Sequence, residues 1–146
     1  PDKNFLMGRF EDLAAEVSRL RYPLQPTPTH GDAHTGNLMI HDGQPMLIDF
    51  ELFAWGQPEW DLSMTATEYE TAGWWTDAEY ASFAEAYGYD VMSWEEGFPT
   101  LRTVREIIMT TWLMQNVNES SEIAREFENR MRKIRGENTV APWRPF

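Results

Sequence analysis

The sequence predicts a mainly α-helical domain of the α+β class, a helical bundle in which one small β-hairpin is embedded. Apolar residues recur at helical spacing in several stretches, and an Asp-Gly pair between two short apolar runs predicts the hairpin. With 146 residues, 42% hydrophobic and 14% aromatic, the chain is long enough for one packed core. We therefore expect residues 1–146 to form a single domain.

The first expected element is an amphipathic helix over about residues 4–21. Its apolar stripe runs through Phe10, Leu13 and Val17 at intervals of three and four residues. Prolines at positions 23, 26 and 28 then end the helix, because proline lacks an amide hydrogen and biases the preceding residue toward extended geometry. The stretch that leads into His30 is therefore expected to be extended.

The hairpin is expected from two short apolar runs, 37–40 and 46–50, on either side of a turn. The turn contains Asp42-Gly43, which is a strong hairpin signal. Pro45 stands at the start of the second run, where a missing amide donor is tolerated. Such a hairpin returns the chain close to the point at which it left.

The remaining elements are expected to be helices. One spans about residues 59–71, and a second begins at an N-cap at Thr76 or Asp77 and stops at Gly88. Two further apolar stripes complete the pattern: Leu101, Val104, Ile108 and Trp112 in one helix, and Ile123, Phe127, Met131 and Ile134 in the other.

Charge and composition exclude several classes of protein. A formal net charge of −12 disfavours nucleic acid as a partner. No apolar run approaches the roughly 18 residues that a membrane-spanning helix needs, so we expect a soluble protein with no membrane partner. The absence of cysteine rules out disulfides and thiolate metal sites and fits a cytoplasmic location.

The acidic residues are unevenly distributed along the chain. Between Tyr22 and Leu101 there are fourteen carboxylates and neither Lys nor Arg. Most of these carboxylates are expected to form a solvated face. The same distribution also creates a field suited to divalent metal ions or to a cationic substrate.

One constellation carries residue types that suit phosphoryl transfer. The segment 30–37 reads HGDAHTGN, and Asp49-Phe50-Glu51 follows after the hairpin. Phosphoryl transfer needs a carboxylate for the attacking hydroxyl and oxygen ligands for the magnesium ion that bridges the phosphates. Asp32, Asn37 and Asp49 could supply these groups if the hairpin brings Asp49 beside Asn37.

These motifs resemble those of the aminoglycoside phosphotransferase and choline kinase-like phosphotransferases. HGDAHTGN resembles the catalytic loop of that family, and IDFE resembles its metal-binding segment. The resemblance implies a protein kinase-like C-terminal lobe, with Asp32 as catalytic base, Asn37 as a magnesium ligand and Asp49 as the principal magnesium ligand. It also implies that His30 is a structural residue that packs the loop.

A third motif, GQPEWDL at residues 56–62, resembles a conserved element of the same family. By this resemblance Asp61 opens a helix and braces the catalytic loop. Glu51 occupies the position of glycine in protein kinases, where it either adds charge near the metal or caps local backbone. His34 either stabilises the turn or contacts the substrate or metal.

The parts of such an enzyme that grip ATP are not encoded in this sequence. There is no G-x-G-x-x-G, and no Lys on a predicted strand precedes a helical Glu. In the resembled family these parts belong to an amino-terminal lobe, which would lie upstream of Pro1 in cis. We therefore expect a C-terminal lobe that binds Mg²⁺ weakly and is inactive alone as an ATP-dependent kinase.

A stand-alone binding or assembly module is the alternative function. In that case the catalytic residues would be vestigial, and apolar surface at the place where the other lobe would dock would drive self-association. An upstream reading frame with strands, a Gly-rich turn and a Lys would favour the kinase. A reading frame that starts near Pro1 would favour the module.

The acceptor pocket is expected among the helices that follow residue 59. Its candidate residues are Trp60, Glu68, Trp74 and Trp75, because aromatic rings beside carboxylates suit a cationic or polyhydroxylated small molecule. Aromatic side chains at helical spacing more often belong to the core. An aminoglycoside, choline, a macrolide and a sugar-like alcohol all stay open as acceptors.

Two other chemistries fit the loop less well. His30, Asp32 and His34 alternate and could ligate zinc from a strand, as in a hydrolase, but Gly31 and Gly36 argue against a straight strand. The segment 31–37 also approaches a phosphate-binding loop, yet it lacks the Lys that such a loop requires.

Overall fold

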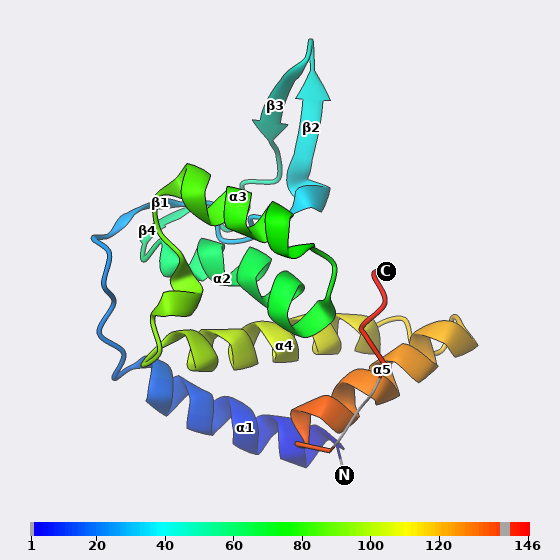
Figure 1. The fold of residues 1–146 in the computed structure, drawn as a ribbon. Helices are drawn as coiled ribbons and strands as arrows, with labels where there is room; N and C mark the ends of the chain where they lie inside the picture. The colour runs from blue at the N-terminus through cyan, green and yellow to red at the C-terminus, as the bar shows by residue number, and fades with distance from the viewer. Residues whose placement is uncertain (1, 138–140) are drawn as a thin grey trace.

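The computed structural model describes residues 2–137 and 141–146. It is mostly helical, 55% of its residues, with small antiparallel strand pairs (Figure 1). The helices are α1 (Asp2–Val17), α2 (Glu59–Thr67), α3 (Asp77–Tyr87), α4 (Phe98–Met114) and α5 (Ser121–Ile134). The expectation of a mainly helical α+β chain is therefore confirmed at this level.

Helix α1 ends at Val17, four residues earlier than the apolar stripe predicted. Side chains just beyond the helix bind its last free carbonyls: Ser18 Oγ donates to Ala15 O at 2.8 Å and Arg19 Nε donates to the same oxygen at 3.0 Å. Polar side chains that bind the last carbonyls stabilise a helix end. Leu20 still packs against the core from the loop that follows the helix.

Helix α2 begins at Glu59 as predicted but changes character before its end. A single π-helical turn, η2 (Glu68–Ala72), continues it, and Gly73 ends the turn with a left-handed φ of 70°. Side-chain periodicity is nearly the same in both helix types, so the sequence predicted one uninterrupted helix. Such π-turns occur often at functional sites.

Helix α3 has both predicted boundaries. The Thr76 side chain accepts a hydrogen bond from Glu79 N, and the Glu79 carboxylate accepts one from Thr76 N, which together form a capping box. Gly88 ends the helix in the left-handed region.

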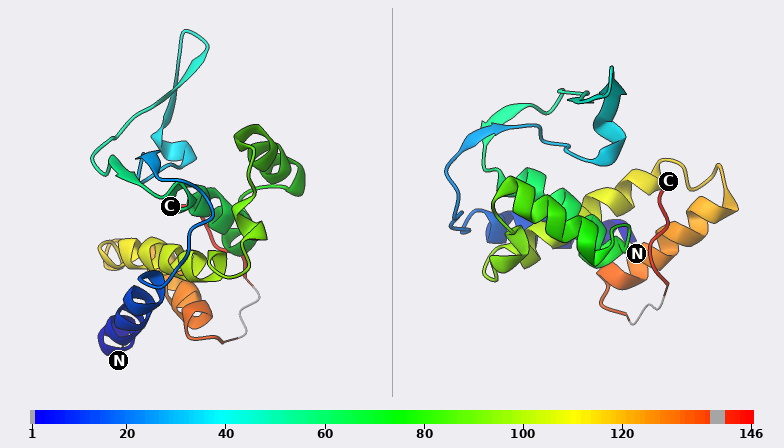
Figure 2. Two further views of the ribbon diagram at one scale, coloured as in Figure 1. Left: turned by 90° about the vertical axis from the view of Figure 1, so that its left-hand side faces the viewer. Right: turned by 45° about the horizontal axis from the view of Figure 1, so that its top comes forward.

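The hairpin consists of β2 (Leu38–His41) and β3 (Gln44–Leu47) joined by Asp42-Gly43, both with positive φ. The second strand begins two residues earlier than predicted, because the two-residue turn closes directly onto the pair His41 and Gln44. Pro45 faces Ile40 in the next pair, where the strand amide points away from its partner. The residues of both strands are exposed, and Figures 1 and 2 show the hairpin extending away from the helical body.

A second strand pair was not predicted. Strand β1 (Thr27–Thr29) pairs antiparallel with β4 (Ala54–Gly56), with Thr29 opposite Ala54. Strands of three residues carry almost no periodic signal, and one of these contains Pro28. Only the long-range contact between the two segments reveals the pair.

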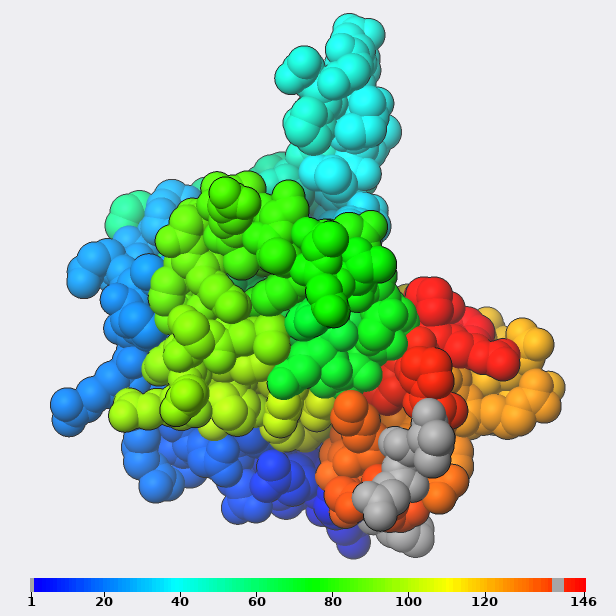
Figure 3. Space-filling view, in the orientation of Figure 1, coloured from blue at the N-terminus to red at the C-terminus, as the bar shows by residue number. Residues whose placement is uncertain are grey.

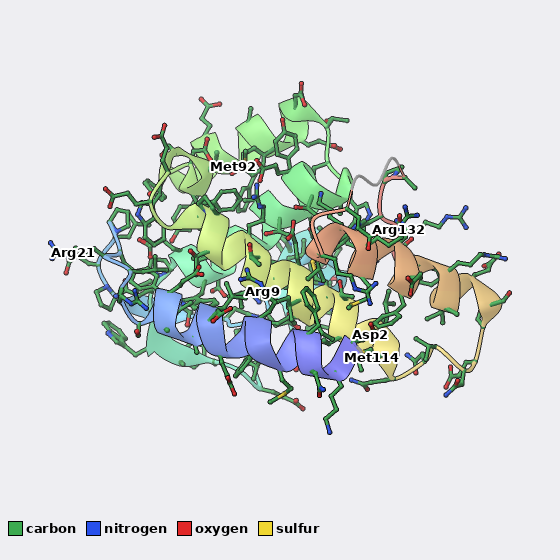
Figure 4. The ribbon with its side chains drawn as sticks, turned by 90° about the horizontal axis from the view of Figure 1, so that it is seen from below. Asp2, Arg9, Arg21, Met92, Met114 and Arg132 are labelled. Atoms are coloured by element: carbon green, nitrogen blue, oxygen red, sulfur yellow. The ribbon has the colours of Figure 1, made fainter. Side chains whose placement is uncertain are left out.

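Helix α4 lies at the centre of the molecule, between two apolar clusters. One cluster joins α2, α3 and the start of α4 and includes Leu62, Tyr80 and Leu101. The other joins α1, α4 and α5 and includes Leu13, Ile107 and Met131. Helix α1 runs antiparallel beneath α4 (Figures 1 and 4). In the described part of the chain, no helix has both the length and the apolar character to cross a bilayer.

Candidate catalytic site

The segment 30–37 is anchored to helix α2 by one carboxylate. Asp61, in the first turn of α2, accepts hydrogen bonds from His30 N at Oδ2, 2.7 Å, and from Gly31 N at Oδ1, 2.8 Å. Gly31 has a φ of 86°, and a Cβ at this position would lie 2.6 Å from Leu52. The start of the loop is therefore held between α2 and residue 52, in a conformation that only glycine tolerates.

His30 connects the loop to the end of the hairpin. Its side chain is buried, its Nδ1 accepts from Asp32 N at 3.3 Å, and its Nε2 lies 2.8 Å from Ile48 O. Because Nδ1 accepts, the neutral ring carries its proton on Nε2, which donates to the Ile48 carbonyl. The ring also packs against Phe50, with centroids 4.8 Å apart.

Asp32 is oriented from both sides by its own loop. Asn37 Nδ2 donates to the backbone oxygen of Asp32 at 2.9 Å and to Oδ2 at 3.2 Å. His34 Nε2 lies 3.4 Å from the same Oδ2, while its Nδ1 accepts from Gly36 N at 3.0 Å. His34 is therefore the tautomer that presents its N–H to Asp32. Among the described residues Oδ1 of Asp32 has no donor, so this oxygen is available to a ligand.

Asn37 offers an oxygen in the same way. The residue is 8% exposed and ends the short 3₁₀ turn η1 (Thr35–Asn37). Its side-chain amide nitrogen makes two hydrogen bonds, and both go to Asp32. Within residues 2–137 and 141–146 its Oδ1 is not engaged, and this atom is a suitable ligand for a hard cation.

Asp49 follows directly on the hairpin. Ile48 N donates to Asn37 O at 2.9 Å, which continues the hydrogen bonds of the hairpin by one residue pair. Asp49 is the next residue after Ile48. Asp49 is exposed and has a φ of 63°, a conformation unusual for a residue other than glycine. Glu51 is also exposed. No residue in the described ranges hydrogen-bonds to either carboxylate. The structure therefore joins Asp32 to Asn37 and ties the backbone just before Asp49 to Asn37, but it does not bring the Asp49 carboxylate into contact with them.

Three cavities border the loop: one is lined by His30 and Ala33, and the other two meet at Glu68. Asp32 and His34 line a cavity of about 290 Å³, which Glu68 also lines. An adjoining cavity of about 530 Å³ is lined by Glu68, Trp74 and Trp75. Three of the four predicted acceptor residues are therefore brought together. Trp60 is not among them, because it packs against the core beneath the Arg105 guanidinium, 5.9 Å from the ring centroid.

Glu68 stands at the junction of the two cavities. It is only 6% exposed, and Trp75 Nε1 donates to its Oε2 at 2.9 Å. Burial is the main cause that raises the pKa of this carboxyl above its ordinary value, and the nearby Asp32 adds to the effect. The indole N–H of Trp75 opposes the shift.

Arg105 is a site residue that the sequence reasoning missed. It is buried, and its guanidinium donates to Trp60 O at 2.6 Å and to Ser63 Oγ at 3.4 Å. Burial lowers its pKa, whereas the charges of Asp61 and Asp32 raise it, so it is a cation beneath the catalytic loop. Its position four residues after Leu101, on the apolar stripe of α4, was the available signal.

The residues described in this structure contain no group of three or more His, Cys, Asp or Glu side chains placed to hold a metal ion. Magnesium does not require such a group, because it usually keeps several waters and takes one or two carboxylates together with phosphate oxygens. Oδ1 of Asp32 and Oδ1 of Asn37, neither of which has a partner among the described residues, fit that sparse donor set. Asp49, which follows the Ile48–Asn37 backbone contact, is exposed.

Comparisons with known proteins address the resemblance directly. A family model described as the phosphotransferase enzyme family matches residues 2–104, which is more than half of the chain and includes the loop, the hairpin and Asp61. No curated protein and no solved structure matches the chain. The expectation from the three sequence motifs is confirmed, and this chain belongs to the phosphotransferase enzyme family.

Proposed function

We propose that this chain is the C-terminal lobe of an ATP-dependent small-molecule O-phosphotransferase with a protein kinase-like fold, in which Asp32 is the catalytic base. The orientation of Asp32 is the observation that carries the proposal. Asn37 and His34 both contact Oδ2, whereas Oδ1 has no donor among the residues that the structure describes, and the Asp32 side chain lines the cavity with Glu68. An acceptor hydroxyl in that cavity could donate to Oδ1.

Residues of this chain would orient the catalytic base and accept the proton of the acceptor hydroxyl. Asp32 Oδ1 takes the proton of the acceptor hydroxyl as the acceptor oxygen forms its bond to the γ-phosphorus and the bond to the ADP oxygen breaks. His34 and Asn37 hold the carboxylate in one rotamer, and Asp61 holds the backbone that carries it. Arg105 supplies positive charge beneath the same loop.

Asn37 Oδ1 and the carboxylate of Asp49 would hold Mg²⁺. When bound, the ion would neutralise negative charge on the β- and γ-phosphates. The exposure of Asp49 supports this role, since the carboxylate must reach a ligand that comes from outside the lobe. Glu51, also exposed two residues later, adds negative charge to the same edge.

The residues that bind the phosphates of ATP would come from an amino-terminal lobe in cis, and that lobe would cover the hairpin. The exposed apolar side chains in and after the hairpin support this placement, because a large exposed apolar patch usually marks an interface with another protein surface. They include Ile40 at 66%, Leu52 at 63% and Trp55 at 73% exposure. We expect this lobe alone to bind magnesium weakly and to transfer little phosphate.

The central experiment is a phosphorylation assay with a panel of alcohols on the longer protein that carries this chain. Asp32→Asn should reduce kcat by about a thousandfold with little change in KM for ATP, because general-base assistance is lost while nucleotide contacts remain. Asp12→Asn, a matched change on the exposed surface of α1, should leave kcat unchanged. Full activity in Asp32→Asn would refute the assignment of the base.

The metal site can be tested on the 146-residue chain without activity. Mn²⁺ as a paramagnetic substitute should broaden the side-chain amide resonances of Asn37 in NMR spectra, and Asp49→Ala should weaken that broadening. The Asp42→Ala variant is the control for loss of one nearby carboxylate. Equal broadening in Asp49→Ala and in the unaltered chain would remove Asp49 from the site.

A non-catalytic assembly module is the second candidate function. The exposed apolar hairpin favours it, since the same surface could bind a second copy of the chain. Sedimentation of the 146-residue chain separates the two. Stable oligomers, together with no phosphate transfer by any longer form of the protein, would favour the module over the kinase.

A further inference from the structure

The cavity beside Asp32 has walls of two different chemical kinds. Its polar side holds Asp32, His34 and Glu68, whereas its other side is largely apolar and includes Met64, Trp74 and Trp112. A polyhydroxylated acceptor would leave its hydroxyls unpaired against such a wall, at a substantial cost in free energy. The wall therefore suits an acceptor with an apolar body.

The carboxyl-terminal segment, residues 141–146, forms part of this wall. Phe146 lines the cavity beside Asp32, and Pro145 lines the adjoining one. Figure 3 shows this segment, in red, against helix α5 and the green segment that contains Trp74. Residues 141–146 lie beyond the 2–104 range that matches the family, so this wall is not part of the matched region.

Buried polar contacts hold the carboxyl-terminal segment in place. Trp74 Nε1 donates to Trp143 O at 2.8 Å, and Arg130 Nη2 donates to Arg144 O at 2.5 Å. Trp143 is 3% exposed, and the Arg130 guanidinium lies 4.7 Å from its ring centroid. The segment is thus an ordered wall of the cavity, fixed by residues of α5 and of the segment after η2.

The charges in the cavity leave one carboxylate for a cation. Arg130 also lines the cavity, but its guanidinium is bound to Glu126, Met109 O and Arg144 O. Asp32 serves the acceptor hydroxyl under the proposed function. Glu68 is the carboxylate that is left to pair with a cation. It is only 6% exposed, and its one hydrogen bond within the described residues comes from Trp75. Its raised pKa reflects the cost of this burial, which a bound cation would offset.

Three apolar side chains of the wall are about half exposed. Ile108 is 48% exposed, Trp112 is 51% and Phe146 is 49%. They come from α4 and from the carboxyl-terminal segment and meet on one cavity. Covering them would remove apolar surface from water, which favours binding of an apolar or aromatic group.

We infer that this cavity selects an alcohol that carries one ammonium group and an apolar body. Glu68 pairs with the ammonium, and the apolar body packs between Trp74, Trp112 and Phe146. This inference rests on the proposed function, since it names the acceptor class of the same site. The carboxyl-terminal segment is then a determinant of specificity that the family match does not include.

Binding can be measured on the 146-residue chain by ¹H–¹⁵N NMR, because Trp74 lines the cavity beside Asp32 and the indole N–H of Trp75 donates to Glu68. The probe is 2-amino-3-phenylpropan-1-ol, which has a hydroxyl, an ammonium and an aromatic ring. We expect it to shift both indole resonances. Two analogues, neutral 3-phenylpropane-1,2-diol and the small cation 2-aminoethanol, should each bind about tenfold more weakly.

Variants assign the two contacts. Glu68→Gln should weaken binding of the amino alcohol about tenfold and leave that of the neutral diol unchanged, whereas Phe146→Ala should weaken binding of both phenyl compounds severalfold. Glu85→Gln, on the exposed surface of α3, is the charge-matched control and should leave all three affinities unchanged. Thermal melts of each variant verify folding. Equal affinity for the amino alcohol and the diol, or equal affinity of Glu68→Gln and the unaltered chain for the amino alcohol, would overturn the inference.

The outcome also separates this inference from the proposed function. If the longer protein phosphorylates neutral polyols in an Asp32-dependent way and rejects the amino alcohol, the kinase assignment holds and the acceptor class is wrong. If the amino alcohol binds as expected but the longer protein phosphorylates no alcohol, the acceptor site stands as a binding site and the kinase assignment fails.

Discussion

The two sides of the catalytic loop differ in how they are held. On the side of α2 and α5, charged groups have partners within the chain: Asp61 binds two loop amides, and the buried Arg130 binds Glu126 and two backbone oxygens. On the side of the hairpin, β2 and β3 extend from the body with large apolar side chains in contact with water. The first side is held by contacts within this chain, and the second leaves large apolar side chains exposed.

This contrast matches the division of work proposed for the site. The paired side carries Asp32 and the acceptor cavity, which must keep a fixed geometry for transfer. The exposed side carries Asp49 and the hairpin, which under the proposal meet a nucleotide supplied with the other lobe. Changes on the first side should therefore unfold the lobe, whereas changes on the second side should alter association without unfolding it.

The largest expected effect is at Arg130. Arg130→Leu leaves Glu126, 4% exposed, without its partner and releases the carboxyl-terminal segment, so the free energy of unfolding should fall by about 3 to 5 kcal/mol. Arg132→Leu, on the same helix at 51% side-chain exposure, should change it by less than about 0.5 kcal/mol. Urea denaturation measures both. Similar losses in the two variants would show that burial of the Arg130 pair does not matter.

Gly31 should come next. In Gly31→Ala the added methyl meets Leu52 at 2.6 Å in a left-handed conformation, and a loss of about 2 to 5 kcal/mol is expected. Gly43→Ala in the hairpin turn has a similar positive φ but no atom within 4 Å of the new methyl, so about 1 kcal/mol is expected. If Gly43→Ala lowers the free energy of unfolding as much as Gly31→Ala does, the destabilisation comes from the left-handed backbone conformation and not from the contact with Leu52.

Glu68 should show a smaller, pH-dependent effect. Because burial raises its pKa in the folded state, its contribution to stability is full below the unfolded pKa and declines as pH rises through the folded value. Glu68→Gln cannot titrate, so its stability relative to the unaltered chain should improve between pH 4 and pH 7. Thermal melts across that range, with Glu85→Gln as the control, test this. A difference that is constant with pH would contradict it.

The smallest change in stability is expected on the hairpin. Leu38→Ala removes a side chain that is already 43% exposed, so unfolding should change by less than about 0.5 kcal/mol. Leu101→Ala, fully buried at 0% exposure, should lose about 2 to 5 kcal/mol. If the hairpin is an interface, Leu38→Ala should still reduce self-association in sedimentation. A large loss of stability in Leu38→Ala would mean that the hairpin belongs to the core of this lobe.

Local patterns predicted most of the secondary structure correctly. The N-cap expected at Thr76 or Asp77, the stop at Gly88 and the Asp-Gly turn are signals that act within a few residues, and the structure has the cap at Thr76, the stop and the turn. The pairing of β1 with β4 was missed because it depends on two segments about 25 residues apart with no periodicity of their own. The π-turn at Glu68 was missed because it leaves the helical side-chain pattern almost unchanged.

The sequence by itself determined the order of the elements and the family, because the spacing of the three motifs is a property of the chain. Only the tertiary structure decided which oxygen of Asp32 is free, that Trp60 faces the core and that Arg105 lies beneath the loop. It also decided that the carboxyl-terminal segment reaches the cavities beside the loop, through Phe146 and Pro145. These outcomes depend on contacts between segments far apart in the chain, where packing and the pairing of buried charges outweigh local preference.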